Sequence, residues 1–504
     1  MRNAYEELTD HFKKIGDLRH VYAISSWDEA SMMPVGGGES RGEALASLGV
    51  VIHEMVTSSQ IGEWLGACSN LDLDEWQSAN LREIEREYLE NTCLSPEFVR
   101  ASSIAGSKAE QSWRIHRANN DWRSMVPHLN EVIRFAREEA SIRSEVNGLG
   151  LYDAMLDTHE PGMRSSILDK LFGELKTELP AMIQMAIELQ SCVPLLPLGD
   201  SFSVERQRDL GLQVMRTIGF DFDHGRLDVS HHPFCGGVQD DVRITTRYTE
   251  ENFIESLMAV IHETGHAMYE QGRPSVMRGQ PVSNARSAGV HESQSLMMEM
   301  QIGRSKAFLE FITPIVCQVF SADSNDPAWS PQNLLRLYTN VERSLIRVDA
   351  DELTYPLHVV LRYEIEKELI EGRAEVTDIP AMWDEKMMTY LNLDTRDNYK
   401  DGCLQDVHWP AQLFGYFPTY TLGAMMAAQF YNSMSIALPD LGEQIRHGHM
   451  HTVVDWLRTN VHGKGSLLTT DQLMESSTGE TLNARYFLDH LKLRYLGTSN
   501  ALVD

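Results

Sequence analysis

Apolar residues recur every three or four positions along most of the chain, which is the period of an amphipathic helix. The segment 357–371 shows the pattern clearly, with Pro356 at its start and Gly372 after its end. One face of this segment carries Leu357, Leu361, Ile365 and Leu369. The pattern predicts a mainly α-helical protein.

One stretch has the two-residue period of a β-strand instead. In 241–248, Val242 and Ile244 alternate with Arg243 and Thr245, so we expect one small β-sheet in an otherwise helical fold. Turn-forming residues predict three breaks between helices, at 36–38, 194–200 and 321–332. Because no repeat and no low-complexity linker divides the chain, we expect a single domain over residues 1–504.

The segment after the predicted strand combines a helical pattern with metal-binding chemistry. Thr249 or Asn252 can cap the start of this helix, and Gly272 can end it. One apolar row at a spacing of four consists of Ile254, Met258, His262 and His266. The two histidines therefore lie one turn apart on a buried face, with Glu263 beside them. This H-E-x-x-H arrangement predicts a site in which two imidazoles hold Zn²⁺ and the glutamate acts as a base.

A catalytic zinc ion needs a third protein ligand, and the residues alone leave its identity open. A third histidine six residues after His266 is excluded, because Gly272 occupies that position. A second amphipathic helix, predicted over 284–303, contains three candidates: His291, Glu292 and Glu299. For Glu299 we favour a solvated or salt-bridged acid over a ligand.

Composition excludes several other classes of protein. The 504 residues include 44 Lys and Arg against 73 Asp and Glu, a net charge of −29, which argues against nucleic acid or an anionic membrane as partner. No 18-residue run is apolar enough to cross a bilayer, and the first residues do not resemble a signal peptide. Six scattered cysteines without a C-x-x-C pair predict reduced thiols and a cytoplasmic location.

Several short motifs agree, in order and spacing, with one known family. They are H-E-T-G-H at 262–266, H-E-S-Q at 291–294, D-x-R-x-T at 241–245, I-R-x-x-A-D at 346–351, G-x-x-Q-D-x-H-W at 402–409, and W-D with M-P near residues 27–34. The chain thus resembles the M32 metallocarboxypeptidases, the carboxypeptidase Taq-like family, over almost its whole length.

The resemblance implies a large helical fold of two lobes with a deep active-site groove, of the H-E-x-x-H gluzincin-like kind. It implies a zinc enzyme, usually a homodimer, in which Co²⁺ can substitute for Zn²⁺. Such enzymes release residues with broad specificity from peptides that have a free C-terminus. It also makes Glu292, from H-E-S-Q, the third metal ligand.

Three residues are candidates for the donor that stabilises the oxyanion of the transition state. We assign His408 and Tyr420 catalytic roles and give Tyr416 a role in substrate binding, with all three as possible donors. The alternative for His408 is a structural bond to Asp406, and the alternative for the two tyrosines is aromatic packing.

An exopeptidase must also recognise a free α-carboxylate, for which a bidentate arginine is suited. Arg347 is the first candidate; the alternative is an ion pair with Asp351 on the same helix. Arg243 is a second substrate-binding candidate, although it could brace the site next to Asp241. Asp241 itself could accept a hydrogen bond from a ligand histidine.

The sequence therefore predicts a cytoplasmic zinc carboxypeptidase. Two alternatives remain. One is a zinc oligo-endopeptidase of similar helical fold, which needs no carboxylate clamp. The other is a non-enzymatic helical dimer with a purely structural metal, which the presence of Glu263 disfavours because a closed site needs no base.

Overall fold

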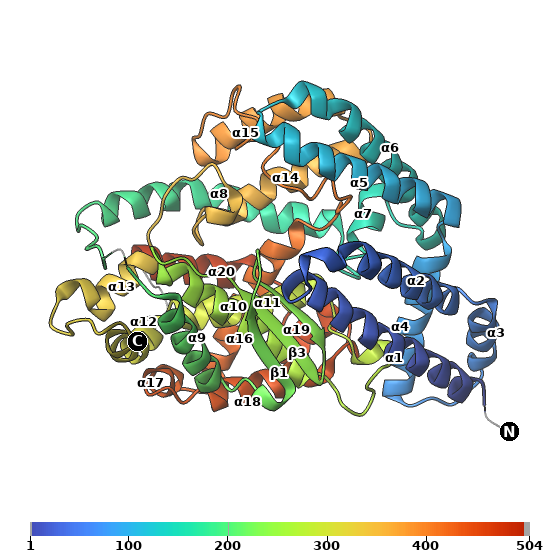
Figure 1. Ribbon diagram of the computed structural model, residues 1–504, viewed down its shortest axis with the longest axis horizontal. Helices are drawn as coiled ribbons and strands as arrows, with labels where there is room; N and C mark the ends of the chain where they lie inside the picture. The colour runs from blue at the N-terminus through green and yellow to red at the C-terminus, as the bar shows by residue number, and fades with distance from the viewer. Residues whose placement is uncertain (1–2, 200, 498–504) are drawn as a thin grey trace.

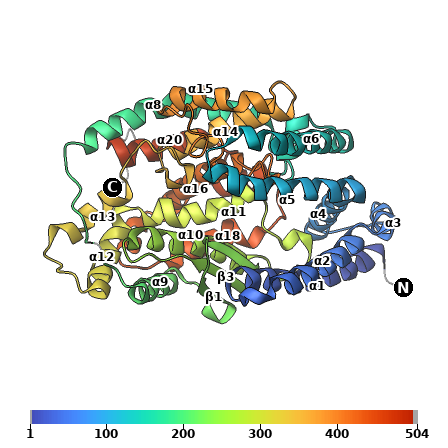
Figure 2. The same ribbon diagram turned by 45° about the horizontal axis from the view of Figure 1, so that its top comes forward.

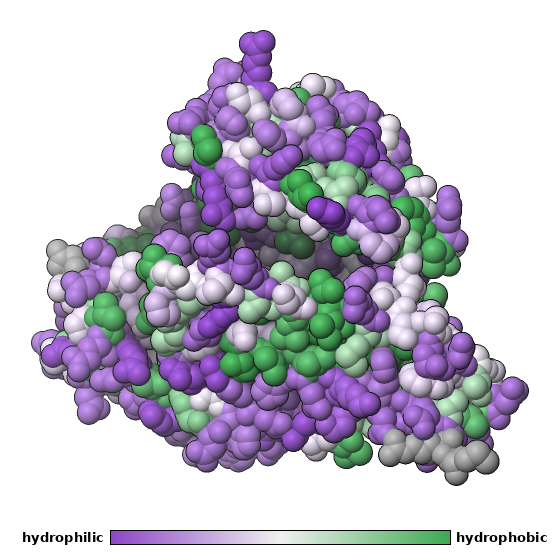
Figure 3. All heavy atoms as spheres, turned by 45° about the vertical axis from the view of Figure 1, so that its right-hand side comes forward, coloured by the Kyte–Doolittle hydropathy of each residue, from purple (hydrophilic) through white to green (hydrophobic). Residues whose placement is uncertain are grey.

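The computed structural model describes residues 3–199 and 201–497, and it is built almost entirely of helices. Figure 1 shows two parts, an upper and a lower group of helices, and Figure 3 shows a deep hollow between them. The mainly helical, two-lobed fold with one small sheet is thus confirmed. Within the described residues, none of the helices has the length and apolarity needed to cross a membrane.

The upper group consists of α5 (Pro96–Ala118), α6 (Trp122–Asn147), α7 (Leu151–Leu156), α8 (Ser165–Gln190), α14 (Tyr355–Ile370) and α15 (Ile379–Leu391). The lower group begins with α1 (Ala4–Ser31), α2 (Gly38–Val56), α3 (Ser59–Cys68), α4 (Glu75–Thr92) and α9 (Val204–Ile218). It continues with α10 (Phe253–Gly272), α11 (Ala288–Leu296), α12 (Lys306–Phe320), α13 (Pro331–Tyr338), α16 (Pro418–Ala437), α17 (Leu441–Arg446), α18 (His451–Asn460), α19 (Thr470–Thr478) and α20 (Ala484–Leu491).

The sheet has the strand order β1 (Gly225–Val229), β3 (Asp241–Thr246), β2 (Phe234–Val238). β1 pairs with β3 in parallel, and β2 pairs with β3 antiparallel. The predicted strand is β3, whose Val242 and Ile244 are fully buried. Because β3 and β2 both pack against α10, the sheet fixes the helix that carries the histidines.

α10, α11 and α16 pack together in the middle of the molecule (Figures 1 and 2). Two glycines permit the close approach of these helices. A Cβ on Gly265 would lie 2.4 Å from the backbone oxygen of Gln294, and a Cβ on Gly423 would lie 2.8 Å from the Cβ of Glu292. The backbones of α10 and α11 can therefore come into contact, and Glu292 has room against α16.

Two details of local structure differ from the predictions. The break predicted at 36–38 does separate α1 from α2, but its residues form the end of a short 3₁₀ turn and the start of α2 and not an open loop. The helix expected over 284–303 begins only at Ala288, where Ser287 caps it, and from Met297 to Gly303 it continues as a π-helix. The wider π-turn changes the direction of the side chains that follow α11, including that of Glu299.

Buried apolar residues from the upper group and most of the lower group form one continuous core. A small separate cluster holds α1 to α4 together, made of Leu8, Phe12, Ile15, Val56, Ile61 and Ile84. The single-domain organisation over 1–504 stays a prediction.

Candidate metal centre

α10 presents the two histidines of H-E-x-x-H as its sequence predicts. Asn252 caps the helix by accepting a hydrogen bond from the backbone N–H of Ile254, and the helix ends at Gly272. His262 and His266 lie one turn apart, with ring centroids separated by 5.0 Å. Both rings are largely buried, and both turn toward α11.

Glu292 on α11 completes a group of three possible ligands. One of its carboxylate oxygens, Oε2, lies 3.4 Å from Nε2 of His266 and 3.9 Å from Nε2 of His262. Two ligand atoms bound to one tetrahedral ion at about 2.0–2.1 Å would be separated by about 3.3 Å. Among the described residues, these three form the one group of at least three His, Cys, Asp or Glu side chains with this geometry. The donor set and spacing fit a divalent metal ion.

The charges around the site also favour a cation. Burial by itself lowers the pKa of His262, but the hydrogen bond to Glu299 and the charges of Glu292 and Glu299 raise that pKa to about 10. Burial raises the pKa of Glu292, yet its hydrogen bond with His266 and the nearby histidines hold it at about 2. Burial and the neighbouring His291 lower the pKa of His266 to about 4, so its ring is neutral at pH 7. A carboxylate and a neutral imidazole are the forms of these two side chains that bind a cation.

Glu263 points into the same space but takes no part in the ligand group. Its side chain is buried, and its Oε2 atom has no hydrogen-bond partner. Burial, together with the nearby carboxylate of Glu292, raises the pKa of Glu263 to about 7, although His262 opposes the shift. A carboxylate with a free oxygen and a pKa near neutrality is suited to accept and return a proton.

Two further contacts orient the ligand histidines. Glu299, held by an ion pair with Arg304, accepts a hydrogen bond from Nδ1 of His262 at 2.8 Å. Nδ1 of His266 lies 3.1 Å from the backbone oxygen of His291. Glu299 is therefore salt-bridged, as favoured from the sequence, and it also has an orienting role that the sequence analysis missed.

Arg347 lies on the other side of the groove, in a short 3₁₀ turn formed by Arg347–Asp349. Its Nε and Nη2 donate to Oδ1 of Asp406 at 3.1 and 2.8 Å, and its Nη1 donates to the hydroxyl of Tyr355 at 2.6 Å. The predicted alternative, an ion pair with Asp351 along one helix, is wrong because the backbone turns there. Asp351 instead caps the backbone N–H groups of Leu353 and Thr354.

Asp406 is the centre of a buried charge cluster. Its second oxygen, Oδ2, accepts from Nε of the fully buried Arg362 at 2.7 Å. Burial opposes ionisation of Asp406, but the two arginines hold its pKa well below the usual range. Two guanidinium groups thus share one carboxylate, which leaves this side of the groove with an excess of positive charge.

His408 and the two candidate tyrosines are close together. Nε2 of His408 lies 3.1 Å from the hydroxyl of Tyr420, and the rings of Tyr416 and Tyr420 meet edge to face at 5.4 Å. Nδ1 of His408 is 3.9 Å from Asp406 and has no hydrogen-bond partner, so the expected structural bond to Asp406 is absent. Burial lowers the pKa of His408 to about 4, so its ring is neutral at pH 7.

Arg243 has a different environment from Arg347. It forms a two-point ion pair with Asp241 on the same strand, and its guanidinium stacks over Trp27 at 4.7 Å. Arg243 does not line either of the two cavities beside the metal ligands. Asp241, which we considered as an acceptor for a ligand histidine, pairs with Arg243 instead.

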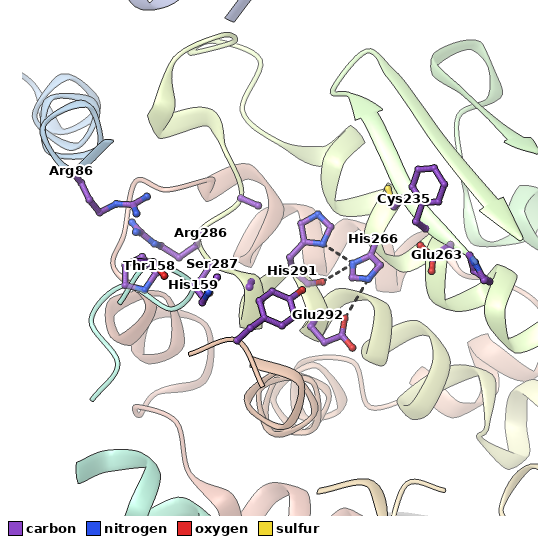
Figure 4. A pocket seen from close by; sticks show the side chains of 16 residues that line it. Arg86, Thr158, His159, Cys235, Glu263, His266, Arg286, Ser287, His291 and Glu292 are labelled. Carbon is purple, nitrogen blue, oxygen red and sulfur yellow. Dashed lines mark hydrogen bonds and ion pairs between the residues drawn. The ribbon is translucent and has the colours of Figure 1, made fainter. Parts of the chain in front are cut away.

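Two cavities meet at the candidate metal site and share Pro233 and Glu292 as lining residues. One, of about 550 Å³, contains Glu263, His266 and Tyr416 and extends toward Arg86 and Arg286 (Figure 4). The other, of about 420 Å³, is lined among others by His262, Glu299, Arg347, Tyr355 and Tyr420. The site therefore lies between two pockets, with Arg347 and Tyr420 on the same side of it.

A family model for the carboxypeptidase Taq (M32) metallopeptidases matches residues 7–495. The chain belongs to this family. It is 37% identical to thermostable carboxypeptidase 1 of Thermus thermophilus and 34% identical to carboxypeptidase 1 of Bacillus subtilis, with 98% of each chain covered in both comparisons. The solved structure of Trypanosoma cruzi metallocarboxypeptidase 1 is 43% identical and superposes with a TM-score of 0.96, covering 98% of this chain and 99% of that one.

Membership confirms the family predicted from the motifs and makes the chain a peptide hydrolase of the metallocarboxypeptidase kind. A metal cofactor and peptide substrates follow from the same membership. The alternative of a non-enzymatic dimer is thereby wrong.

Sequence reasoning missed several side chains that support the site. Glu270 lies one turn beyond His266 on α10, so the four-residue spacing of the helix could have shown it. His291 was considered only as a ligand. Tyr355 and Arg362 carry no local signal, because they meet Arg347 and Asp406 only through the tertiary fold.

Proposed function

We propose that this protein is a zinc-dependent carboxypeptidase that removes C-terminal residues from peptides with broad specificity. The observation that carries the proposal is the placement of a His–His–Glu group, an unpartnered glutamate and a buried arginine around one groove. His262, His266 and Glu292 would hold the metal in the gluzincin-like manner, with Zn²⁺ preferred and Co²⁺ able to replace it. This donor set is typical of catalytic zinc sites with one open position.

A bound zinc ion would lower the pKa of a coordinated water to around 7 and polarise the scissile carbonyl. Glu263 then takes the proton from the attacking water on its free Oε2 and returns it to the leaving amine. The protein groups alone raise the pKa of Glu263 to about 7, and a cation beside it would lower that pKa, so Glu263 meets the water as a carboxylate.

Tyr420 is the donor we propose for the oxyanion. It lines the cavity that contains Arg347, whereas His408 lies behind it. Burial raises the pKa of Tyr420, so the phenol keeps its proton. If Nε2–H of the neutral His408 donates to the phenol oxygen, the Tyr420 proton is free to point into the cavity.

Arg347 is the residue we propose for the α-carboxylate of the substrate. A guanidinium has five N–H donors, and the side chain of Arg347 uses three of them for Asp406 and Tyr355. Two remain for a substrate carboxylate, and Tyr416 would contact the peptide in the other cavity.

A free-ended peptide tests the proposal. Mass spectrometry should show a C-terminal ladder that disappears with a chelator and returns with Zn²⁺ or Co²⁺. The same peptide with an amidated C-terminus should stay intact. Internal cleavage of the amidated peptide would instead support the oligo-endopeptidase alternative.

A cytoplasmic homodimer is part of the proposal. The dimer rests on the family resemblance, and light scattering of the purified protein would test it. The location is supported by the cysteines, all six of which are free thiols.

A further inference from the structure

Both ring nitrogens of His266 have a partner. Nε2 faces Oε2 of Glu292 at 3.4 Å, while Nδ1 lies 3.1 Å from the backbone oxygen of His291 and 2.6 Å from Nδ1 of the His291 ring (Figure 4). Both the carbonyl oxygen and the carboxylate can only accept. In the proposed metal-bound site Nε2 gives its lone pair to the ion, so the single proton of the neutral His266 ring is on Nδ1.

The ring of His291 must then be the other tautomer, with its proton on Nε2. Because Nδ1–H of His266 points at it, Nδ1 of His291 acts as an acceptor, and the single proton of a neutral ring is on Nε2. That Nε2 lies 3.0 Å from Oε1 of Glu270. Both nitrogens of His291 are thus occupied, so His291 is not available as a metal ligand.

Glu270 anchors the end of this chain of hydrogen bonds. Its other oxygen, Oε2, forms an ion pair with Nε of Arg273 at 3.2 Å. Burial alone raises the pKa of Glu270, but Arg273 and the N–H of His291 bring it down to about 2. The group is a carboxylate, which accepts and cannot donate.

The chain also connects two helices. Glu270 and His266 are one turn apart on α10, and His291 precedes Glu292 on α11. The rings of His266 and His291 are 4.5 Å apart, and Tyr269 packs against His291 at 5.5 Å. The path from Glu270 to His266 therefore fixes a ring on α10 relative to the carboxylate on α11.

We infer that Glu270 and His291 are positioning residues, which set the tautomer and ring orientation of His266 and thereby raise the affinity of the site for its metal. The inference rests on the metal ligands proposed above. His262 is oriented by a single residue, Glu299, through a direct hydrogen bond. His266 is oriented by two residues in series, His291 and then Glu270. Such outer partners are typically worth 10–100-fold in metal affinity.

Metal affinity, measured without any substrate, tests this inference. The zinc-free protein is titrated with Zn²⁺ against a competing chelator, for the wild type and for Glu270→Gln, His291→Ala and Glu299→Gln. Each variant should bind Zn²⁺ about 10–100-fold more weakly. The control is Glu364→Gln, since Glu364 on α14 also accepts from several side chains but contacts no ligand, and its affinity should be unchanged.

The ligands themselves separate this inference from the proposed function. If His262→Ala and His266→Ala bind Zn²⁺ like the wild type, the proposed ligand set is wrong. If those two lose Zn²⁺ while Glu270→Gln and His291→Ala bind within twofold of the wild type, the positioning role is overturned and the ligand set stands.

A measurement on the wild type covers the case in which His291→Ala does not fold. Two-bond ¹⁵N–¹H spectra of histidine-labelled, zinc-loaded protein report the tautomer of each ring. We expect the proton of His266 on Nδ1 and that of His291 on Nε2. A proton on Nδ1 of neutral His291 would contradict the inference directly.

Discussion

The two sides of the groove are assembled in different ways. On the metal side, His262, Glu263 and His266 come from one helical turn, and only Glu292 arrives from a neighbouring helix. On the proposed substrate side, Arg347, Asp406 and Tyr420 come from three separate segments and meet only in the folded chain. A four-residue spacing is therefore enough to predict the first, whereas the second depends on long-range packing.

The two sides also differ in charge. Glu263, Glu292 and Glu299 surround the two imidazoles, with Arg304 as the partner of Glu299. Across the groove, Arg347 and Arg362 share the single carboxylate of Asp406. One side thus favours a cation and the other an anion, which matches a metal ion and the terminal carboxylate of a peptide. Substitutions on one side should leave the function of the other side intact.

The largest effect is expected for Glu263→Gln on the metal side. Without the base, turnover should fall about 10²–10⁴-fold, because proton transfer loses its acceptor. The metal content, measured by elemental analysis, should remain that of the wild type, since Glu263 is not in the ligand group. Turnover within a few-fold of the wild type would show that another residue is the base.

Asp406→Asn should have the next largest effect, on stability. The change leaves the buried Arg362 and Arg347 without an anion, and the loss of one partner of a buried pair costs about 3–5 kcal/mol. Thermal unfolding of the zinc-loaded protein measures the change. If Asp406→Asn unfolds at the same temperature as Glu263→Gln, the buried ion pairs of Asp406 do not stabilise the fold as we expect.

Arg347→Lys should weaken recognition of the C-terminus and leave the metal bound. A lysine keeps the charge but cannot bind a carboxylate in two-point fashion, so kcat/KM for a free-ended peptide should fall about 10–100-fold. Arg243→Lys is the matched control, because Arg243 lies outside both cavities and should behave like the wild type. A fall in kcat/KM for Arg243→Lys, with Arg347→Lys unchanged, would show that Arg243 binds the substrate carboxylate.

The smallest effect concerns the pH dependence of stability at Glu366, which accepts from Tyr152, Trp409 and the backbone of Gly415 behind the substrate side. Burial raises the pKa of Glu366 from 4.5 to about 7. Between these values the folded chain binds more protons than the unfolded chain, so this group's contribution to stability falls as the pH rises.

Glu366→Gln removes that titration. The free energy of unfolding of the wild type, relative to Glu366→Gln, should fall by at most about 1.4 kcal/mol per pH unit from pH 4.5 to about 7 and then level off. Denaturant titrations at several pH values measure the difference. A relative stability that does not change with pH would show that the pKa of Glu366 is ordinary.

Local signals account for what could be predicted of the fold. Asn252 and Gly272 bound α10, Val242 and Ile244 mark β3, and both predictions are confirmed. The π-helix at Met297–Gly303 was not predicted, because its residues have the same apolar pattern as an α-helix and differ only in hydrogen bonding. The alternative ion pair between Arg347 and Asp351 was also wrong. Nothing near Arg347 in the sequence specifies Asp406 as its partner.

The sequence by itself determined the helical class, the spacing of the two imidazoles and the position of Glu263 beside them, because a helix repeats every 3.6 residues whatever surrounds it. Residue chemistry and spacing alone could not decide between His291, Glu292 and Glu299, which all lie within nine residues of one another, and only the family resemblance indicated Glu292. The packing of α11 against α10 and α16 separated them, as it turned Glu292 toward both imidazoles and gave His291 and Glu299 other partners. The direction in which a side chain points within a site is set by the packing of the helices. The sequence pattern gives only the spacing of the residues along the chain.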